Sequence, residues 1–398
     1  MRKPTILVCA DYYLPGCKAG GALRTLLNTV EALGGEFDFR VLTRDRDISD
    51  SEPYGSASEG EWLRVGKAQV AYLAPNELRP SALRRCIAGC EHDLLFLNSA
   101  LSGPFTVLPL ILRRLGFLDE PSVIVAPRGE FSRSALDQKK LKKAVFLPVA
   151  RAVGLYRGVR WLASCEDEAE QIRRAVGGDA DIAVAPDPVA FASGNPERDS
   201  STKKDSGHLR ACFLSRICRM KNLKGALDVL ATMEAERGTV EFDIYGPKED
   251  RRYWKECEDV IGSLPPNVKA RYCGAIGLTE VRGILETYHL LFLPTMGENF
   301  GHVIVESLSA GCPVLISDRT QWNDLGEQGA GWVVPLEDGG GFRTALVEAL
   351  ALDGGKHAAY SACAREYASG IARRLDAVGR NRRCIEECLG AAGREGST

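Results

Sequence analysis

Apolar residues along the chain gather into short runs of strand length that alternate with longer amphipathic segments. The first half contains the runs TILVCAD, FRVLTRD, DLLFLNS, SVIVAPRG, VRWLASC and IAVAP, and helical patterns such as ALRTLLNTVEAL and TVLPLILRRLG lie between them. Strands that alternate with helices predict a parallel sheet with crossover helices. After residue 207 the pattern starts again with LRACFLS, VEFDIYG, VKARYCG, LLFLP, PVLIS and GWVVP. The sequence therefore predicts an α/β protein with two Rossmann-like domains.

The two halves are separated by residues 187–207, DPVAFASGNPERDSSTKKDSG, which are rich in Pro, Ser, Gly and charge and lack an apolar period. Such a composition is typical of a linker. We expect a first domain over residues 1–190, a linker over 191–207, a second domain over 208–355, and helices over 356–398 that pack back across the domains. Because ligands of such sheets bind beyond the carboxyl ends of the strands, the two parallel sheets are expected to face each other across a cleft.

Composition agrees with a large globular protein. The 398 residues predict two or three domains, and 45% hydrophobic with 26% charged residues is ordinary usage. The net charge of −2 implies no general attraction to nucleic acid. Thirteen cysteines are scattered through apolar patterns, which favours a reducing cytosol over a secreted disulfide framework. No CxxC pair and no apolar run of 18 residues occur, so neither a structural zinc site nor a membrane span is expected. The N-terminal apolar segment is too short for a signal peptide.

The segment ENFGHVIVESLSAGCPVLISD, residues 298–318, places two glutamates around the start of a helix. We expect this helix to begin near Gly301 and to stop at Gly311 and Pro313. Its free N–H groups and positive dipole end are suited to a phosphate. Glu306, one turn inside, can accept hydrogen bonds from a diol such as ribose, while Glu298 can reach a second polyol beyond the phosphates. A nucleotide sugar has this layout.

The alternative is that the two glutamates only favour the helix dipole and a solvated helix face. The apolar neighbours of Glu306 in VIVESL argue against it, since a carboxylate on a mostly buried helix is costly unless something satisfies it.

Further candidates stand where strands give way to helices. Arg216 and Lys221 flank such a turn in LSRICRMKNLKG, where two cations can hold a diphosphate in place of a metal; alternatively, they only cover the end of the sheet. Gly20 and Gly21 precede the first helix, so their backbone can approach a ligand closely, although glycines also simply make turns.

The first domain has candidates of its own after two strands. Arg128 and Glu130 follow SVIVAP and are expected to face the cleft; an exposed ion pair within the loop is the alternative. Asn98 and Ser99, which end DLLFLNS, are placed similarly.

Taken together, these motifs resemble a retaining glycosyltransferase of family 4 with the GT-B fold, and more narrowly the bacterial members that build exopolysaccharide or lipopolysaccharide. ENFGHVIVE resembles the family's two glutamates separated by seven residues, SRICRMKNL its Arg and Lys phosphate clamp, and the GG loop its first-domain turn. TRDRDISDSEPY, FLNS and APRGEFSRSALDQKKLKK resemble segments of the polysaccharide subgroup. Many members carry a histidine after a first-domain strand, whereas this chain has PRGE there, so Arg128 or Glu130 is expected in its place.

The resemblance implies transfer of a sugar from a nucleotide diphosphate sugar to a hydroxyl of a glycan or lipid-linked glycan, with retention at the anomeric carbon. The acceptor then lies on the first domain and the donor on the second. The resemblance also implies attack on the same face, with the leaving phosphate taking the acceptor proton. Its catalytic residues are Glu298, Arg216, Lys221 and Arg128, and its donor-binding residues are Gly20, Gly21, Asn299, Phe300, Gly301, His302, Glu306 and Glu130.

No cofactor and no metal are expected, because the cations at the clamp can hold the diphosphate. The DxD strings at residues 45–47 and 179–181 are explained by chance.

Three other classes of protein are alternatives to this interpretation. A sugar-nucleotide epimerase needs additional acid and base groups in the cleft, and an NAD oxidoreductase needs a glycine fingerprint; neither is evident. A non-catalytic protein that binds nucleotide sugars or glycans keeps the same donor motifs and remains open.

A basic segment of the first domain suggests where in the cell the protein acts. Residues 128–160 carry nine basic and two acidic side chains, a net charge of +7, and KKLKKAVFLPVARAVG interleaves these charges with apolar residues. The nearby TVLPLILRRLGFL adds an apolar segment with an arginine pair. We expect a cytoplasmic protein with peripheral contact, through residues 137–153, to the anionic inner face of the membrane, where a polyprenyl-linked acceptor is presented. The alternative is a buried apolar face with solvated lysines, in a helix that Pro148 interrupts.

Overall fold

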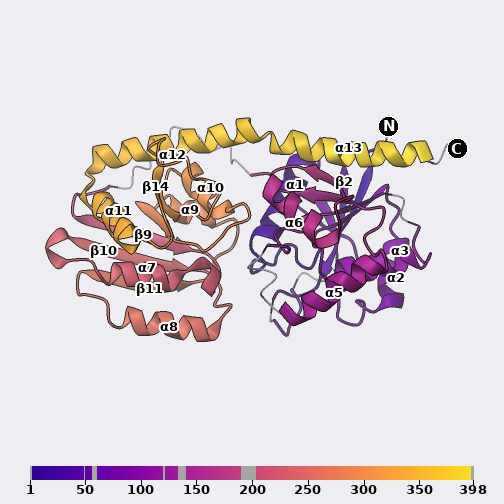
Figure 1. The fold of residues 1–398 in the computed structure, drawn as a ribbon, viewed down its shortest axis with the longest axis horizontal. Coiled ribbons are helices and arrows are strands. Elements are labelled where there is room, and N and C mark those ends of the chain that lie inside the picture. Colours follow the sequence, from indigo (N-terminus) through magenta and orange to yellow (C-terminus); the bar gives the residue numbers. More distant parts are fainter. Residues whose placement is uncertain are drawn as a thin grey trace. The chain divides into compact units, whose positions relative to one another are not determined.

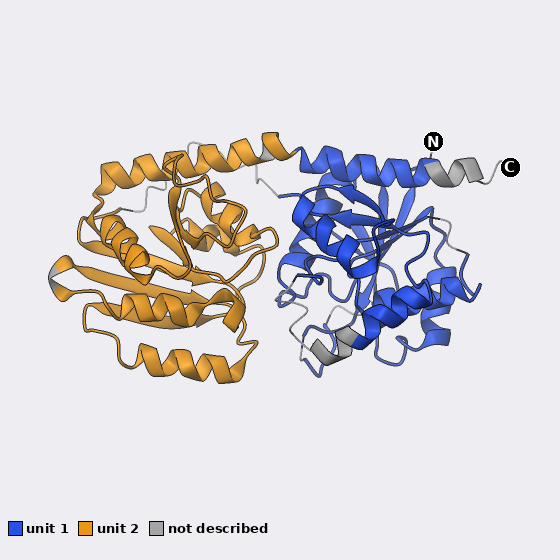
Figure 2. Cartoon of the chain, in the orientation of Figure 1, with its two compact units in different colours: residues 1–190, 376–398 blue, residues 191–375 orange. Residues whose placement is uncertain are grey.

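The computed structural model describes residues 2–48, 50–55, 61–119, 122–132, 140–189 and 203–395. The chain divides into two compact units, residues 1–190 with 376–398 and residues 191–375 (Figure 2). Each unit is built around one sheet with helices packed against it (Figure 1). The predicted α/β architecture of two Rossmann-like units is confirmed.

The sheet of unit 1 has, among the described residues, eight strands in the order β3-β4-β2-β1-β5-β6-β7-β8. In chain order they are β1 (Thr5–Cys9), β2 (Asp38–Arg44), β3 (Leu63–Val65), β4 (Ala68–Leu73), β5 (Leu94–Leu97), β6 (Val123–Val125), β7 (Arg160–Ala163) and β8 (Asp181–Val184). The helices are α1 (Gly21–Leu33), α2 (Pro80–Ala88), the π-helical turn η1 (Gly103–Val107), α3 (Leu108–Arg114), α5 (Lys140–Ala152), α6 (Glu166–Val176) and α13 (Ala377–Glu395).

The hairpin of β3 and β4 was not predicted from the sequence, and it corrects the expectation of a purely parallel sheet in this unit. β3 pairs antiparallel with β4 across a turn at Gly66, whose φ is 59°, while the remaining neighbours pair in parallel. Three residues are too few for a periodic signal, and β3 lies at the edge of the sheet, where its side chains are largely solvated.

The sheet of unit 2 is parallel throughout its described part, in the order β11-β10-β9-β12-β13-β14. Its strands are β9 (His208–Leu214), β10 (Thr239–Tyr245), β11 (Val268–Gly274), β12 (Leu290–Leu293), β13 (Val314–Ser317) and β14 (Gly331–Val334). The helices are α7 (Leu223–Leu230), α8 (Arg251–Ile261), α9 (Val281–Leu285), α10 (His302–Ser309), α11 (Gly339–Ala351) and α12 (Gly354–Leu375), with 3-10 turns η2 (Arg219–Lys221) and η3 (Ala235–Arg237).

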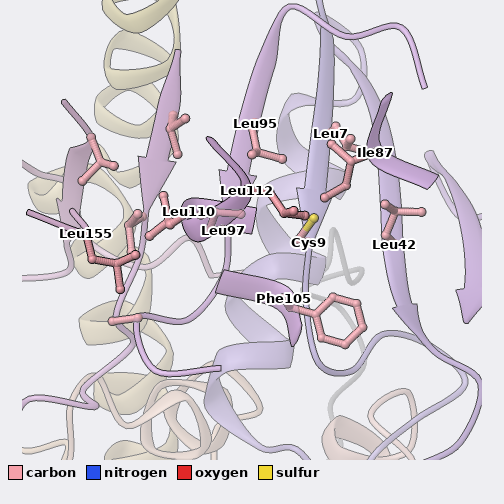
Figure 3. Packing of buried hydrophobic residues seen from close by; sticks show 14 of the residues in the cluster. Leu7, Cys9, Leu42, Ile87, Leu95, Leu97, Phe105, Leu110, Leu112 and Leu155 are labelled. Carbon is pink, nitrogen blue, oxygen red and sulfur yellow. The ribbon is translucent and has the colours of Figure 1, made fainter. Parts of the chain in front are cut away.

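Burial of the apolar runs holds each sheet in place. In unit 1, Leu7, Cys9, Leu95 and Leu97 alternate along the two central strands and pack in one cluster with Phe105 of η1 (Figure 3). All thirteen cysteines are free thiols, and Cys9 is part of this core. Within unit 2, α12 packs on α10, and within unit 1, α13 packs on α1. No helix among the described residues is long and apolar enough to span a membrane.

The strand order of each sheet also shows where the loops at the carboxyl ends of the strands diverge. In unit 1 the chain builds outward from β1 to β2 and then returns to place β5 on the other side of β1; in unit 2 it does the same with β12 beside β9. Neighbouring loops diverge at such reversal points, and ligands of open α/β sheets bind there, at the carboxyl ends of the strands. These points lie beyond β1 and β5 in unit 1 and beyond β9 and β12 in unit 2.

Candidate functional site

Three loops meet at the carboxyl ends of the adjacent strands β9, β12 and β13 in unit 2. The β9 loop comprises residues 215–222, the β12 loop 294–301 and the β13 loop 318–326. The β12 loop lies between the other two: the Met296 amide donates to Met220 O at 2.8 Å, and the Glu298 amide donates to Arg319 O at 3.2 Å. Backbone bonds on both sides therefore hold Glu298 in position.

Lys221 of the β9 loop and Glu298 of the β12 loop form an ion pair, with Nζ and Oε1 2.6 Å apart. The two side chains are only 12% and 9% exposed. A pair this far out of water is stable only while both partners are present, because removal of one leaves an uncompensated charge. The structure thus brings together two residues that the sequence placed 77 positions apart.

Asn222, which the sequence analysis did not select, links the same two loops. It adopts the left-handed conformation with a φ of 56°, accepts a hydrogen bond from Gly225 N as the N-cap of α7, and donates from Nδ2 to Pro294 O at 2.9 Å. An Asn one residue before an apolar helical run is a recognisable N-cap signal, and that signal was available.

Helix α10 begins immediately after Gly301, as predicted, and this glycine N-cap has no side chain to cap the first turn. The φ of Gly301 is 80°, and a Cβ there would approach Ile304 Cδ1 at 3.0 Å, so this position requires glycine. Asn299, beside it in the β12 loop, is half-buried. Phe300 is buried, with its ring 4.8 Å from that of His302. The turn therefore presents backbone N–H groups and a positive dipole end, which suit an anion.

The remaining two predicted residues of unit 2 are more accessible. Glu306 lies on α10 and is half-buried. Arg216 is about 40% exposed and binds Glu249, with NH1 2.6 Å from Oε2. The β9 loop thus carries one buried cation, Lys221, and two solvent-accessible cations, Arg216 and Arg219, the latter paired with Glu256.

In unit 1, Gly20 and Gly21 form the start of α1. Gly20 has a φ of 69° and is the N-cap of the helix, so this capping position also carries no side chain. Asn98, at the carboxyl end of β5, donates to Ala22 O at 3.2 Å and so connects the neighbouring strand to the first turn of α1.

Arg128 is part of a buried network rather than of an exposed loop ion pair. Its NH1 lies 2.8 Å from Asp187 Oδ1, both side chains are about 5% exposed, and its Nε donates to Asn98 Oδ1. The second carboxylate oxygen of Asp187 accepts from Thr25 in α1 at 2.8 Å. This network therefore holds the glycine turn against the sheet. Asp187 had been assigned only to the linker, and no local pattern distinguishes it.

Glu130 is also buried and engages the loop after β5. Oε1 accepts from Ser99 Oγ at 2.8 Å, and Oε2 accepts from the amides of Ala100 and Leu101 at 2.6 and 2.9 Å. Burial raises the pKa of this carboxyl group, and the three hydrogen bonds oppose that rise. Whether Arg128 or Glu130 takes the place of the expected histidine stays a prediction.

The DxD strings serve the local structure. Asp47 accepts hydrogen bonds from the amides of Cys17 and Lys18, Asp45 binds Arg46, and Asp181 binds Arg160. Among the residues that the structure describes, no group of three or more His, Cys, Asp or Glu is arranged to hold a metal ion.

Known proteins share this architecture. Residues 208–352, the main part of unit 2, match the family model "Glycosyl transferases group 1". A sucrose-phosphate synthase from Thermosynechococcus elongatus superposes with a TM-score of 0.71 at 16% identity, over 98% of this chain and 100% of that one. The fold is GT-B. Anabaena Alr3699/HepE, solved with UDP and glucose, gives 0.70 at 16% identity over 98% and 100% of the two chains.

WaaG, a glycosyltransferase involved in lipopolysaccharide biosynthesis, gives a TM-score of 0.60 at 14% identity over 92% of this chain and 95% of that one. A comparison with curated protein sequences found no match. At such low identities the structural likeness establishes the GT-B fold, and the match of residues 208–352 ties the glycosyl transferase similarity to unit 2.

Proposed function

We propose that this protein is a retaining glycosyltransferase that moves a sugar from a nucleotide diphosphate sugar to a hydroxyl of a glycan or lipid-linked glycan in cell-surface polysaccharide synthesis. The observation that carries the proposal is the buried Lys221–Glu298 pair beside the glycine N-cap of α10, inside the segment similar to group 1 glycosyl transferases. Alr3699/HepE, solved with UDP-glucose, and WaaG, of lipopolysaccharide biosynthesis, support the donor and the pathway class.

The donor diphosphate binds at the start of α10. Backbone N–H groups at Gly301 to Val303 and the helix dipole favour its charge, and Lys221 and Arg216 add two cations. Both cations are paired with carboxylates in the structure, so the diphosphate competes with Glu298 and Glu249 for them. As the bond between the anomeric carbon and the phosphate oxygen breaks, negative charge builds on the leaving group, and these donors are already in position to stabilise it.

The two glutamates bind the polyol parts of the donor. Glu306 accepts hydrogen bonds from the ribose diol, and Glu298 holds hydroxyls of the transferred sugar. The acceptor oxygen attacks from the face that the phosphate leaves, and its proton passes to a phosphate oxygen. No protein nucleophile is needed, and the same-face attack retains the anomeric configuration.

Unit 1 supplies the acceptor side and a second contact to the donor. Gly20 and Gly21 let the backbone approach the diphosphate, because no side chain stands in the way. The Arg128–Asp187 pair and Asn98 hold that turn in place.

The decisive experiment incubates the full-length protein with UDP-, GDP-, ADP- and dTDP-sugars and a membrane glycan extract. Release of nucleoside diphosphate and a product whose anomeric proton coupling matches the donor's are expected. Binding without release indicates a non-catalytic binding protein, an epimerised donor indicates an epimerase, and an inverted product contradicts retention.

The proposed acceptor places part of unit 1 at an anionic membrane. Val145 and Val149 of α5 and Val153, the first residue after it, follow each other at a spacing of four and are 55–61% exposed. Ile111, Leu115 and Phe117, on and after α3, are 40–64% exposed as well. We call these six residues the apolar surface.

The apolar surface is bordered by arginines. Arg114 donates to Val153 O at 3.5 Å, and Arg113 donates to Arg157 O at 2.9 Å, so α3 and the end of α5 lie side by side. Apolar side chains bordered by cations match an anionic bilayer better than they match water. Lys139 lies outside the described residues, as do the side chains of Lys140, Lys142 and Lys143, so their part in this contact rests on the sequence.

A further inference from the structure

Two side chains of the β13 loop donate hydrogen bonds to one carbonyl oxygen of the candidate donor site, that of Phe300. Trp322 is 4% exposed, and its indole N–H donates to Phe300 O at 2.8 Å. Gln321 Nε2 donates to the same oxygen at 3.3 Å. The indole ring also packs edge-on against the Phe300 ring, with centroids 5.3 Å apart. Two side chains from a loop that supplies none of the predicted site residues thus determine the orientation of the Phe300–Gly301 peptide.

That peptide is the first one of the turn that opens α10. In a planar trans peptide the C=O and the N–H point in opposite directions. A hydrogen bond that fixes Phe300 O on the Trp322 side therefore aims the Gly301 N–H away from Trp322, toward the open end of the helix. Gly301 permits this because its φ of 80° is available to glycine.

The loop that carries Trp322 is itself anchored to α12. The Asp324 carboxylate accepts hydrogen bonds from Tyr367 and from Arg374 NH1, the latter at 3.2 Å. The Arg374 guanidinium also lies over the Tyr367 ring, 5.3 Å from its centroid. Arg374 is the penultimate residue of α12, and the chain passes into unit 1 at Asp376. Helix α12 thus holds the β13 loop through Asp324, and the loop in turn holds the Phe300 carbonyl through Trp322.

We propose that Trp322 is a positioning residue for the donor: it aims the first N–H groups of α10 at the diphosphate, and Asp324 keeps its loop docked on α12. This inference rests on the proposed function, because it assigns a diphosphate to the start of α10. It adds a residue outside the glutamate motif and outside the Arg and Lys clamp.

The test compares binding of a diphosphate with binding of its parent nucleoside in Trp322→Phe. UDP, GDP and ADP are first screened on the wild-type protein by calorimetry, and the matching nucleoside is measured by competition. The variant keeps an aromatic ring but loses the indole N–H together with the five-membered ring that carries it. Since one hydrogen bond corresponds to about a fivefold change in affinity, diphosphate affinity is expected to fall about fivefold while nucleoside affinity stays unchanged.

Trp332→Phe is the matched control. Trp332 likewise donates its indole N–H, here to Glu348 Oε2 at 2.8 Å, and likewise contacts an aromatic ring, here stacked on Tyr360, but it lies on the edge strand β14. This variant should leave the ratio of diphosphate to nucleoside affinity at the wild-type value.

The inference is overturned if Trp322→Phe loses affinity for the diphosphate and for the nucleoside equally, so that the ratio of the two affinities stays at the wild-type value. If Trp322→Phe does not fold, Gln321→Ala serves instead, because Gln321 is exposed and donates to the same carbonyl. A smaller fall in the ratio of diphosphate to nucleoside affinity then supports the inference. No fall in that ratio overturns it. A wild-type protein that binds none of the three diphosphates overturns the proposed function, and the inference with it.

Discussion

At the residue scale, the notable feature is that the proposed phosphate-binding cations already have carboxylate partners. Lys221 is paired with Glu298 in a buried contact, and Arg216 is paired with Glu249 at the surface. A donor diphosphate must compete with these partners, and it succeeds if the helix start and both cations act together. Variants of the buried pair therefore affect stability and function at once, and the two effects must be separated.

Glu306→Ala and Lys221→Ala are expected to weaken donor binding or turnover, whereas Glu298→Ala acts mainly on the chemical step. Loss of one charge-assisted contact in such a site costs about 2–4 kcal/mol of transition-state stabilisation. Steady-state rates at limiting and saturating donor separate the two effects. If all three variants kept the wild-type rates under both conditions, the site assignment would be wrong.

The control for this series is the double variant Lys221→Ala/Glu298→Ala. Each single variant strands a buried charge, which costs about 3–5 kcal/mol of folding free energy, while the double variant removes both charges. Thermal melts should therefore show the double variant to be less destabilised than the sum of the singles.

Treatment with EDTA is expected to leave activity largely intact. Lys221, Arg216 and the start of α10 already supply positive charge where the leaving group forms. Transfer rates before and after chelation and dialysis provide the measurement. Activity that disappears with EDTA and returns with magnesium or manganese would contradict this expectation.

At the element scale, α5 combines two roles along one helix. Its inner residue Ala150 is buried in the core of unit 1, while Val145 and Val149, with Val153 directly after the helix, are exposed. The sequence is compatible with a membrane contact or with a purely buried apolar face, and the exposed valines favour the membrane contact. Pro148 lies inside the helix and does not end it.

Sedimentation with anionic liposomes tests this surface. Replacement of Lys139, Lys140, Lys142 and Lys143 by Glu is expected to reduce the bound fraction more than tenfold at low salt, since each basic residue near an anionic surface contributes about 1 kcal/mol. Val145→Ser/Val149→Ser/Val153→Ser should weaken binding even in high salt, because it removes the apolar part.

A control with the same change in charge replaces Arg251, Arg252, Lys255 and Lys269, four exposed cations of unit 2, by Glu. This variant should bind liposomes like the wild type. A protein that stays in the supernatant at low salt, or a lysine variant that still pellets fully, refutes the membrane contact.

At the scale of the whole molecule, unit 2 contains a buried histidine cluster at the end of the sheet opposite the candidate site. His289 Nδ1 accepts from Arg210 N at 2.9 Å, and His357 Nε2 lies 3.0 Å from His289 O. Burial lowers the pKa of His289 to about 3 and also lowers that of His357. The Lys204 ammonium, held by Leu350 O and Leu352 O, lowers both further.

The pH dependence of folding follows from these shifts. The unfolded chain binds protons on both histidines near pH 6.5, while the native state keeps His289 neutral down to about pH 3. Their contribution to stability is therefore complete above pH 6.5 and is lost progressively as the pH falls below it. Each histidine contributes at most about 1.4 kcal/mol per pH unit in that window.

Denaturant unfolding at pH 7.0 and pH 5.5 measures this effect. His289→Asn keeps an acceptor for Arg210 N and should flatten the dependence. A wild-type stability that is equal at the two pH values would contradict the assignment.

Much of this molecule is determined by local pattern in the sequence. The apolar runs identified twelve of the fourteen described strands, and the central ones are clearest because burial on both faces of a parallel sheet favours continuous Val, Ile and Leu. The glycines and the apolar period around Gly301 located the start of α10, because only glycine adopts its φ without strain. The site motifs were recognisable for the same reason: each lies within one loop and the helix that follows it.

Only the tertiary structure decided what these loops touch. The pairing of Lys221 with Glu298, the burial of Arg128 against Asp187 and the contact of Trp322 with Phe300 join residues far apart in the chain. They depend on which strands become neighbours, and strand order is set by the packing of the whole sheet. A periodic pattern reports which face of an element is buried, but it does not report which side chain of another element meets that face.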